Sequence, residues 1–496
     1  MATPMTDTVP DGDPITARPT GGTGGALDRT GFAWAIFEWA RNPYYLMVVI
    51  YIFAPYFARD IIGADLLASG ELDHLDAEAA TTTANAQGQA TIAAVTKWAG
   101  MIAALTAPFL GAALDRGGRL KPLLGIFFAL IATCSALLWF ALPGGEGLPA
   151  WAIMSLLVVA YVCYTYSEVT HNAMLPAAGR PSSLSMISGL GLGLGNLAGA
   201  IIFLAIIMLF VLPAMIQWPF AEPQFGLNMA RFEHARMVGP LCAVWIAVFS
   251  IYFFKNARDP GRPGASWIAA LREGSIGLLQ TFREAARYRE LLKFLVAHML
   301  YADGMAALLA LIAVYFSLFL GWGILELTIY AIYASVFAFA GGLIGGWLDG
   351  KFGVKKALLI EIAAMALAFG LQLSVTQESL FFGAIDNAVL WDSIVFETLS
   401  DLTVLALVSL VATSVTASIS SSRSMLVTLA PTGRSGEFFG LYAIAGTITV
   451  WMGPLLIEYF TLWFNDQRAG MASINILFVI GGAVLLCVRM PQTRPA

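Results

Sequence analysis

The sequence predicts an all-α membrane protein with 12 transmembrane helices in two pseudo-symmetric halves of six helices each. Three observations predict this fold: the composition, the number of long apolar runs, and a turn motif that occurs twice. Hydrophobic residues make up 58% of the chain and charged residues only 12%, whereas soluble proteins carry roughly 25% charged residues. A helix of about 20 apolar residues crosses a bilayer. Twelve such runs use most of the 496 residues and leave no room for a soluble catalytic domain.

The first half is predicted over residues 29–254, after a tail of residues 1–28. The tail is rich in Thr, Gly, Pro and Asp and has no apolar stretch, so we expect a disordered cytosolic segment and not a cleavable signal peptide. A polar loop is expected over 59–89, between the first two spans. The six predicted spans are 31–58, 90–113, 120–142, 149–174, 184–212 and 237–254.

The second half is predicted over residues 291–496, after a basic cytosolic connector of residues 255–290. It contains a longer acidic loop, 377–399, before its fourth span. The six predicted spans are 291–319, 324–348, 354–376, 400–427, 437–462 and 470–489.

The turn after the second span is repeated after the eighth. The first copy contains Gly111, Asp115, Arg116, Gly118 and Arg119, followed by Lys121. The second copy contains Gly345, Asp349, Lys351, Gly353 and Lys355. The segment Leu175-Pro-Ala-Ala-Gly-Arg180 is likewise echoed by Leu429-Ala-Pro-Thr-Gly-Arg434. Two repeated segments in the same order predict a duplicated chain, as in transporters built from internal repeats.

The repeated turn suggests a gate between the two halves. An Asp at the start of a helix caps free backbone N–H groups, and cations pair with helix C-termini or with acids of the other half. Ordinary topological signals explain the cations equally well. They do not explain the repeated Gly and Asp spacing, so we expect a gating role.

The distribution of Lys and Arg predicts the orientation. Most of them fall in the tail, the connector and the alternate turns that share one side with these segments. Arg231, Arg236 and Arg468 fall on the other side. Because cytosolic loops are enriched in Lys and Arg, we expect both termini in the cytosol and the protein in the plasma membrane.

Enzyme classes find no support in the sequence. It contains no nucleophile elbow, phosphate loop or metal cluster in a supporting context, and the four cysteines are scattered singly. We therefore expect no enzymatic activity, no cofactor and no metal.

Several segments carry a resemblance to a known family. The repeated turn resembles the signature loop of the major facilitator superfamily. Within that superfamily the chain is similar to the autophagy-related vacuolar-effluxer-like family and its bacterial relatives. The similar segments are Trp34-Ala-Ile-Phe-Glu-Trp-Ala40, Asn172-Ala-Met-Leu-Pro176, Ser188-Gly-Leu-Gly-Leu-Gly-Leu-Gly195, the residues 294–304 and the residues 437–446. The resemblance implies a 12-span alternating-access carrier, with export of amino acids as the activity of fungal members.

Charged residues inside the first span are the first candidates for the transport pathway. Glu38 and Arg41 are one helical turn apart, with Asn42 beside them. A buried charge is costly and therefore usually faces a cavity or a partner. The pair is either a substrate clamp, with Arg41 on a carboxylate and Glu38 on an amine or a proton, or a mutually neutralising structural pair.

Further candidates lie in other spans. Asp303, two residues after Tyr301, is about midway through the seventh span, where coupling sites lie in such folds. The alternative is an Asp that is hydrogen-bonded to a neighbouring helix. Glu168 and His171 are either a proton relay or a solvated pair at the interface. Glu361 is embedded in the ninth span. Lys97 is predicted to extend toward the membrane surface.

Five glycines of the fifth span, Gly189, Gly191, Gly193, Gly195 and Gly199, are spaced for close helix packing. A dinucleotide loop is excluded because no strand precedes them.

These residues lead to the hypothesis of a proton-linked exporter of a small polar metabolite, with an amino acid as the first guess. The alternatives are a peptidoglycan-fragment or peptide permease, a lipid flippase, or a transport-dead receptor or scaffold. A flippase is expected to show a charged groove that opens sideways to lipid. We expect a monomer in contact with membrane lipid, a small-molecule substrate and protons, and no nucleic acid.

Overall fold

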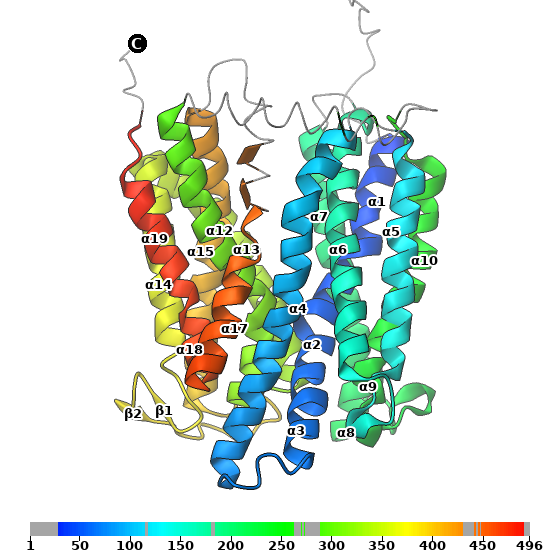
Figure 1. Cartoon of the computed structure of the whole chain (residues 1–496), viewed down its shortest axis with the longest axis vertical. Helices are drawn as coiled ribbons and strands as arrows, with labels where there is room; N and C mark the ends of the chain where they lie inside the picture. The colour runs from blue at the N-terminus through cyan, green and yellow to red at the C-terminus, as the bar shows by residue number, and fades with distance from the viewer. Residues whose placement is uncertain are drawn as a thin grey trace, which may run out of the picture.

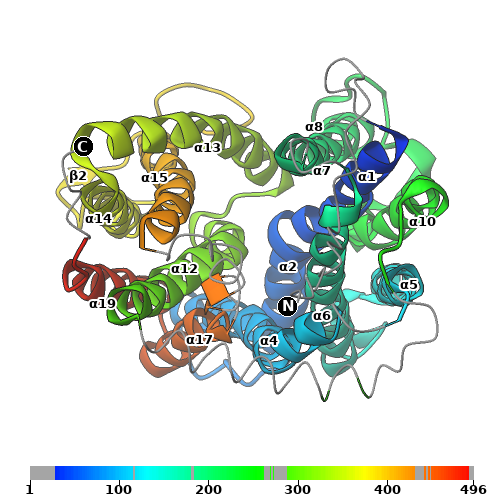
Figure 2. The ribbon, with the colours of Figure 1, turned by 90° about the horizontal axis from the view of Figure 1, so that it is seen from above.

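The computed structural model describes residues 28–114, 118–179, 184–261, 269, 272, 288–429, 441–442, 445–446 and 448–490. Two groups of long helices stand side by side, one from each half of the chain (Figure 1). Seen from above, the helices of each half lie together on their own side of the bundle (Figure 2). Apart from a two-stranded hairpin, the regular structure of the described residues is helical.

The first half begins with one long, irregular helix made of α1 Arg29–Tyr44, a π-helical segment η1 Tyr45–Tyr51, α2 Phe53–Tyr56, a second π-helical segment η2 Phe57–Gly63 and α3 Ala64–Ala68. Pro43 and Pro55 lie within it and cannot donate a backbone hydrogen bond. Among the described residues, the remaining α-helices of this half are α4 Ala77–Leu114, α5 Leu120–Leu137, α6 Ala150–Met174, α7 Leu184–Ile206, α8 Leu212–Ile216, α9 Glu233–Arg236 and α10 Val238–Asn256.

The second half begins with α12, Arg289–Tyr315. It continues with α13 Ile324–Phe352, α14 Val354–Gln372, the strands β1 Ser379–Leu380 and β2 Ile385–Asp386, α15 Leu399–Leu429, α17 Met452–Phe464, α18 Gln467–Ala472 and α19 Ile474–Leu486. Strands β1 and β2 are antiparallel and lie in the predicted acidic loop, 377–399.

Ten helical segments of the described chain are long and apolar enough to cross a membrane. The other two predicted spans correspond to α14 and to the region that ends in α17. The all-α prediction with two halves of six spans is therefore confirmed.

The predicted polar loop over 59–89 is wrong. Helical structure continues to Ala68 and resumes at Ala77, so that the turn covers only residues 69–76. The sequence was misleading because the first turns of α4 are polar although they are helical. Gln89 is fully buried there and donates hydrogen bonds to the other half, to Thr461 Oγ1 at 2.9 Å and to the Gln467 carbonyl at 3.0 Å.

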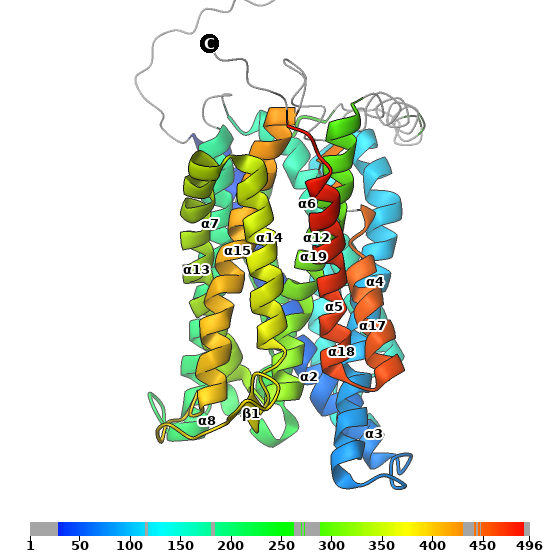
Figure 3. The same ribbon diagram turned by 90° about the vertical axis from the view of Figure 1, so that its left-hand side faces the viewer.

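Within each half, the helices pack in a similar order. In the first half α1 packs against α7 and α10, and α6 packs against α4 and α5. In the second half α15 packs against α13 and α14, and α12 against α19. Between the halves, α17 lies beside α4 (Figure 3).

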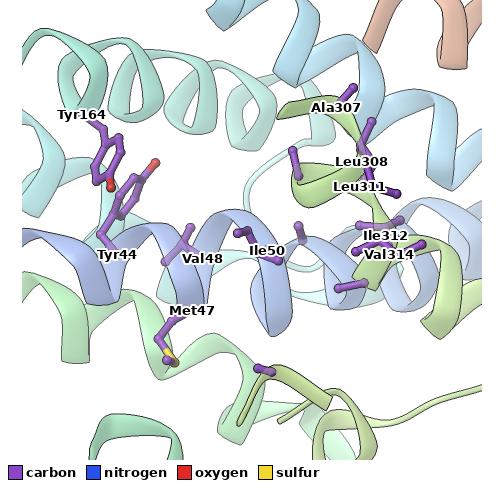
Figure 4. Packing of buried hydrophobic residues seen from close by; sticks show 14 of the residues in the cluster. Tyr44, Met47, Val48, Ile50, Tyr164, Ala307, Leu308, Leu311, Ile312 and Val314 are labelled. Atoms are coloured by element: carbon purple, nitrogen blue, oxygen red, sulfur yellow. The ribbon is translucent and has the colours of Figure 1, made fainter. Parts of the chain in front are cut away.

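Buried hydrophobic residues join the halves where η1 packs against α12. Met47, Val48 and Ile50 of η1 lie in one cluster with Leu308 and Leu311 of α12 (Figure 4). Because these residues come from the first helix of each half, the cluster forms a central contact about which the halves pack.

The two ends of the bundle differ in charge. We call the end where α4 meets α5, α10 ends and α12 begins the connector face, and the end with the 69–76 turn and the β1–β2 strands the hairpin face (Figure 1). Most of the described Lys and Arg residues lie at the connector face. The described cations of the hairpin face are Arg59, Arg231, Arg236 and Arg468. Arg59 was missing from the sequence-based assignment and pairs with the adjacent Asp60 at 3.0 Å.

Candidate functional site

Arg41 of α1 is the centre of a buried charged cluster. Its side chain is 5% exposed and its Nη2 donates to Glu38 Oε2 at 2.9 Å. Its Nη1 reaches Glu168 Oε2 of α6 at 3.4 Å. The guanidinium also lies over the ring of Tyr164, 4.2 Å from the centroid, an arrangement that stabilises a desolvated cation. The helical spacing of Glu38 and Arg41 brings them together, and the α1–α6 contact adds Glu168.

His171 completes the cluster from the end of α6. Its ring is stacked between Trp34 and Phe37, with centroid distances of 4.0 and 3.9 Å. Its Nε2 lies 2.9 Å from the Trp34 carbonyl oxygen, and its Nδ1 lies 3.4 Å from Glu38 Oε1. His171 is fully buried. The solvated alternative for the Glu168–His171 pair is therefore wrong for His171, whereas Glu168 is 50% exposed.

A cavity of about 370 Å³ opens beside this cluster. Its charged lining residues are Glu38, Arg41 and Glu168. Val450 belongs to the second half, and every other lining residue belongs to the first. The other lining residues are Asn42, Tyr45, Gly100, Ala103, Tyr161, Tyr164, Thr165 and Gly195. The cavity therefore lies in the first half and borders the second half at Val450, with two carboxylates, one guanidinium and three tyrosines in its wall.

The glycines of α7 allow α1 to approach. A Cβ atom on Gly195 would lie 3.2 Å from Asn42 Cβ, and one on Gly199 would overlap Leu46 Cδ1. Gly191 meets Trp34, whereas Gly193 has no such neighbour within 4 Å. Gly189 lies in α7, but its surroundings are outside the described residues. The close packing of α7 therefore depends on glycines four residues apart, Gly191, Gly195 and Gly199, and brings Asn42 into the cavity wall.

The candidate residues of the second half do not line this cavity. Asp303 is 1% exposed, and its Oδ2 accepts from the backbone N–H of Gly453 at 3.0 Å, at the start of α17. This is the hydrogen-bonded alternative considered above. Glu361 accepts from Ser421 at 3.0 Å. Both carboxyl groups therefore bond to neighbouring helices within the second half.

Tyr301 occupies a place that corresponds to Arg41. Arg41 is the thirteenth residue of α1, which begins at Arg29, and Tyr301 is the thirteenth residue of α12, which begins at Arg289. Glu168 precedes the repeated Leu-Pro segment at Leu175 by seven residues, and Ser422 precedes Leu429 by seven. The hydroxyl groups of Tyr301 and Ser422 are 2.7 Å apart. The ion pair of the first half thus has a neutral hydroxyl pair as its counterpart in the second half.

The gating motif is only partly described, because Asp115 and Arg116 lie outside the described residues. In the first copy, Lys121 Nζ donates to the Ala257 carbonyl at 2.8 Å, just after α10 ends. In the second copy, Lys355 Nζ donates to the carbonyls of Leu486 and Val488 at 2.9 and 2.7 Å, at the end of α19. Each lysine therefore binds the last helix of its own half, and neither bond reaches the other half.

The connector also binds this turn. The Asp259 carboxylate accepts from the backbone N–H groups of Leu120 and Lys121, at 3.0 and 2.9 Å. It therefore caps α5, a role that the sequence analysis missed although Asp is a common capping residue. The backbone of Gly261 passes so close to Gly118 that a Cβ atom on Gly261 would overlap the Gly118 carbonyl oxygen.

Lys97 does not extend to the membrane surface, and that prediction is wrong. Its Nζ lies 2.5 Å from Glu458 Oε2 of α17, with side-chain exposures of 11% and 20%. The pair joins the two halves. Nearby, Asn85 donates to the Leu318 carbonyl at 3.0 Å, and Asn465 donates to Thr83 at 2.8 Å. Polar contacts between the halves thus extend along α4 from the hairpin face.

Comparison with known proteins identifies the family. The family described as "Vacuole effluxer Atg22 like" matches residues 29–496. The chain belongs to this family. A relative described as the uncharacterized MFS-type transporter YxiO of Bacillus subtilis (strain 168) is 26% identical over 461 residues, which cover 92% of this chain and 94% of YxiO. The protein is therefore a membrane transporter of the major facilitator type and not an enzyme.

Solved structures share the fold with this Atg22-like protein. The D-xylose-proton symporter has a TM-score of 0.58 at 10% identity and covers 93% of this chain and 98% of its own. A mutant of the peptide transporter POT, in complex with alafosfalin, has a TM-score of 0.56 at 14% identity, with coverages of 92% and 93%. A mutant of the nucleoside transporter NupG has a TM-score of 0.51 at 13% identity, with coverages of 92% and 99%. At these identities the likeness shows the fold alone.

The three tyrosines of the cavity wall were not among the residues singled out from the sequence. Tyr45, Tyr161 and Tyr164 lie in apolar spans and look like ordinary core residues. A helical projection of α6 places Tyr161, Tyr164 and Glu168 on one face, three and four residues apart, and this spacing was the signal available in the sequence.

Proposed function

We propose that this Atg22-like protein is a proton-linked exporter of a small metabolite that carries an amino group, with an amino acid as the leading candidate. The observation that carries the proposal is the charge of the cavity beside Arg41. Its wall holds two carboxylates and one guanidinium, so the lining carries one excess negative charge when all three groups are ionised. An ammonium group neutralises that excess.

The geometry suits a molecule with both an ammonium and a carboxylate group. Glu168 is the more exposed of the two acids, with 50% of its side chain exposed, and is the natural partner of the ammonium group. Arg41 Nη1 makes only long contacts, 3.4 Å to Glu168 and 3.4 Å to the Tyr164 carbonyl, and a solute carboxylate can replace them. The rings of Tyr45 and Tyr161 add surfaces that attract a cation.

Alternating access supplies the transport step. In carriers built from repeats the solute binds between the halves, and their rocking exposes the site to one side at a time. Polar contacts along α4 hold the halves together in this structure, including Lys97–Glu458 and Asn465–Thr83. Because Lys and Arg gather at the connector face, we further propose that this face and both termini are cytosolic.

A lipid flippase receives less support than a small-solute carrier. A lateral groove of about 500 Å³ does lie between α7 and α13. Its lining is apolar except for Asn196, Ser335 and the Tyr51 hydroxyl, and no charged residue lines it. A groove that passes lipid headgroups is expected to carry charge, so we favour the charged cavity beside Arg41 as the transport site.

Transport by purified protein in liposomes with an imposed pH gradient tests the proposal. We expect movement of one or more amino acids and no movement of a dicarboxylate, a nucleoside, a sugar or a labelled lipid. Glu168→Gln removes the proposed ammonium partner and should lower the apparent affinity at least tenfold.

The control is Glu146→Gln, the same chemical change at an exposed ion pair with Arg231 near the hairpin face. It should transport as the unaltered protein does. Transport of a sugar or a lipid in place of amino acids would refute the proposal, and so would equal effects of the two substitutions.

A further inference from the structure

We propose that the coupling proton binds between His171 Nδ1 and Glu38 Oε1, and that this proton and the ammonium group of the solute exclude each other. The inference rests on the proposed function and gives it a coupling site. It concerns a position that lies just outside the solute cavity and is formed by one residue of α1 and one of α6.

The hydrogen bonds of His171 define the position. Nε2 lies 2.9 Å from the Trp34 carbonyl oxygen. A carbonyl oxygen can only accept, so Nε2 carries a hydrogen. In neutral His171 the other nitrogen, Nδ1, is then an acceptor, and it faces the carboxylate oxygen Glu38 Oε1 at 3.4 Å. Two acceptors that face each other lack the hydrogen that would join them, and one added proton supplies it.

The rest of Glu38 is already occupied. Arg41 Nη2 donates to Oε2 at 2.9 Å and to Oε1 at 3.1 Å, and Arg41 Nε donates to Oε2 at 3.3 Å. Arg41 therefore fixes the carboxylate and leaves the side of Oε1 toward His171 for the proton.

Few other charged or titratable groups surround the pair of His171 and Glu38 in the described contacts. In the described contacts, α1 supplies Glu38 and Arg41, and α6 supplies Glu168 and the Tyr164 hydroxyl as charged or titratable groups. Against them α7 presents Gly191 and Gly195, and α10 presents the ring of Phe253. Arg41 and Glu168 are thus the charges through which the proton and the solute affect each other.

The charges determine the sign of the coupling. With neutral His171, the cluster of Glu38, Arg41, Glu168 and His171 carries one net negative charge and attracts an ammonium group. With the proton bound, the net charge is zero and the attraction is lost. Coupling between two binding sites is reciprocal, so a bound ammonium group must also weaken proton binding. Such competition produces exchange of the solute for a proton.

Burial sets the route of the proton. His171 is fully buried, whereas Glu38 is 16% exposed and lines the cavity. A proton that breaks its bond to Nδ1 leaves through Glu38 to water in the cavity. A solute in the cavity occupies the same exit, so the two ligands compete by position as well as by charge.

The first test uses the unaltered protein. Binding of a transported amino acid is measured by calorimetry in two buffers with different ionisation enthalpies. We expect about one proton released per solute bound in the pH range where the pair titrates, and an affinity that rises by up to about tenfold per pH unit there, the limit for one competing proton. Uptake of a proton, or binding without any proton release at all pH values from about 5 to 9, would overturn the inference.

The second test uses His171→Gln and His171→Phe, of which the second keeps a ring between Trp34 and Phe37. In both variants, the affinity for the amino acid at high pH divided by that at low pH should fall toward one. The control is His74→Gln, at an exposed histidine of the 69–76 turn, which should keep the pH dependence. Undiminished pH dependence in a folded His171 variant would refute the site. If both variants fail to fold, the proton count of the unaltered protein decides alone.

The outcomes separate this inference from the proposed function. If the protein binds and moves no amino-bearing solute, the proposed function fails. If it moves such a solute and the proton count or the pH dependence is absent, only the coupling site fails.

Discussion

The ion pair between Lys97 of α4 and Glu458 of α17 should control how firmly the two halves are joined where these helices pack together. The two atoms are 2.5 Å apart, and the side chains are 11% and 20% exposed. Removing one partner of a buried pair costs about 3–5 kcal/mol, because the other charge is left without compensation. Both side chains retain some exposure. We therefore expect Lys97→Met to destabilise the conformation in which the halves are joined at this pair by about 3 kcal/mol, at the lower end of that range.

Glu458→Gln should cost less than Lys97→Met. The lysine left behind still lies near the ring of Trp98, with Nζ 5.1 Å from the centroid, and a cation over such a ring gains about 0.5–1 kcal/mol or more. The double variant leaves no unpaired charge, so its cost should be smaller than the sum of the two single costs.

Spin labels on Glu71→Cys and Asp392→Cys measure the effect, because these exposed positions lie on different halves at the hairpin face. Cys487, the exposed native cysteine, is first replaced by serine. A change of about 3 kcal/mol shifts the ratio of the joined conformation to the conformation with separated halves by roughly 150-fold. The fraction of molecules with a long distance between the two spin labels should rise in Lys97→Met and should be lower again in the double variant. Unchanged distances in both single variants, or additive costs, would show that the pair does not hold the halves together.

Three further predictions concern packing, the buried acid of α12 and the gating motif. Gly341→Ala should lower the free energy of unfolding by about 1–3 kcal/mol, because its Cβ would overlap the Thr413 carbonyl oxygen of α15; Gly346→Ala, with no neighbour within 4 Å, should change the thermal midpoint little. Asp303→Asn keeps an acceptor for the backbone of α17 and should transport with normal proton coupling, whereas Asp303→Leu should unfold at lower temperature; loss of coupling in Asp303→Asn would instead assign the proton role to this residue. Arg116→Ala should reduce liposome transport more than Lys351→Ala, since the second copy of the motif has glycine in place of Arg116, and equal losses would contradict an asymmetric gate.

Much of the fold could be predicted because its physical causes are local. Apolar runs of bilayer length indicated the spans, and the repeated turns indicated the two halves. The prediction of a loop over residues 59–89 failed for a reason that hydropathy cannot show. Residues such as Asn85 and Gln89 are polar because they bond to the other half, and a polar helix of this kind resembles a loop when only composition is considered.

The candidate site was predictable only along single helices. Glu38 and Arg41 share a helical turn, so their contact follows from spacing alone. Their contact with Glu168 and His171 depends on how α6 is rotated toward α1, and no spacing within one helix determines that rotation. The same limit explains Asp303, whose depth in the span was predicted but whose partner, the backbone of Gly453, lies 150 residues away.

The counterpart of the Arg41–Glu168 ion pair in the second half is the neutral pair of Tyr301 and Ser422. A transmembrane voltage acts on the first pair and its neighbour Glu38 but exerts no net force on the second. Moving one elementary charge through a full drop of about 100 mV is worth about 2.3 kcal/mol. Rocking of the charged half without solute therefore carries part of a charge through the field, which transient currents from oriented membranes can record. Glu168→Gln leaves only the opposite charges of Glu38 and Arg41, which cancel, and would make that movement electrically silent at this position.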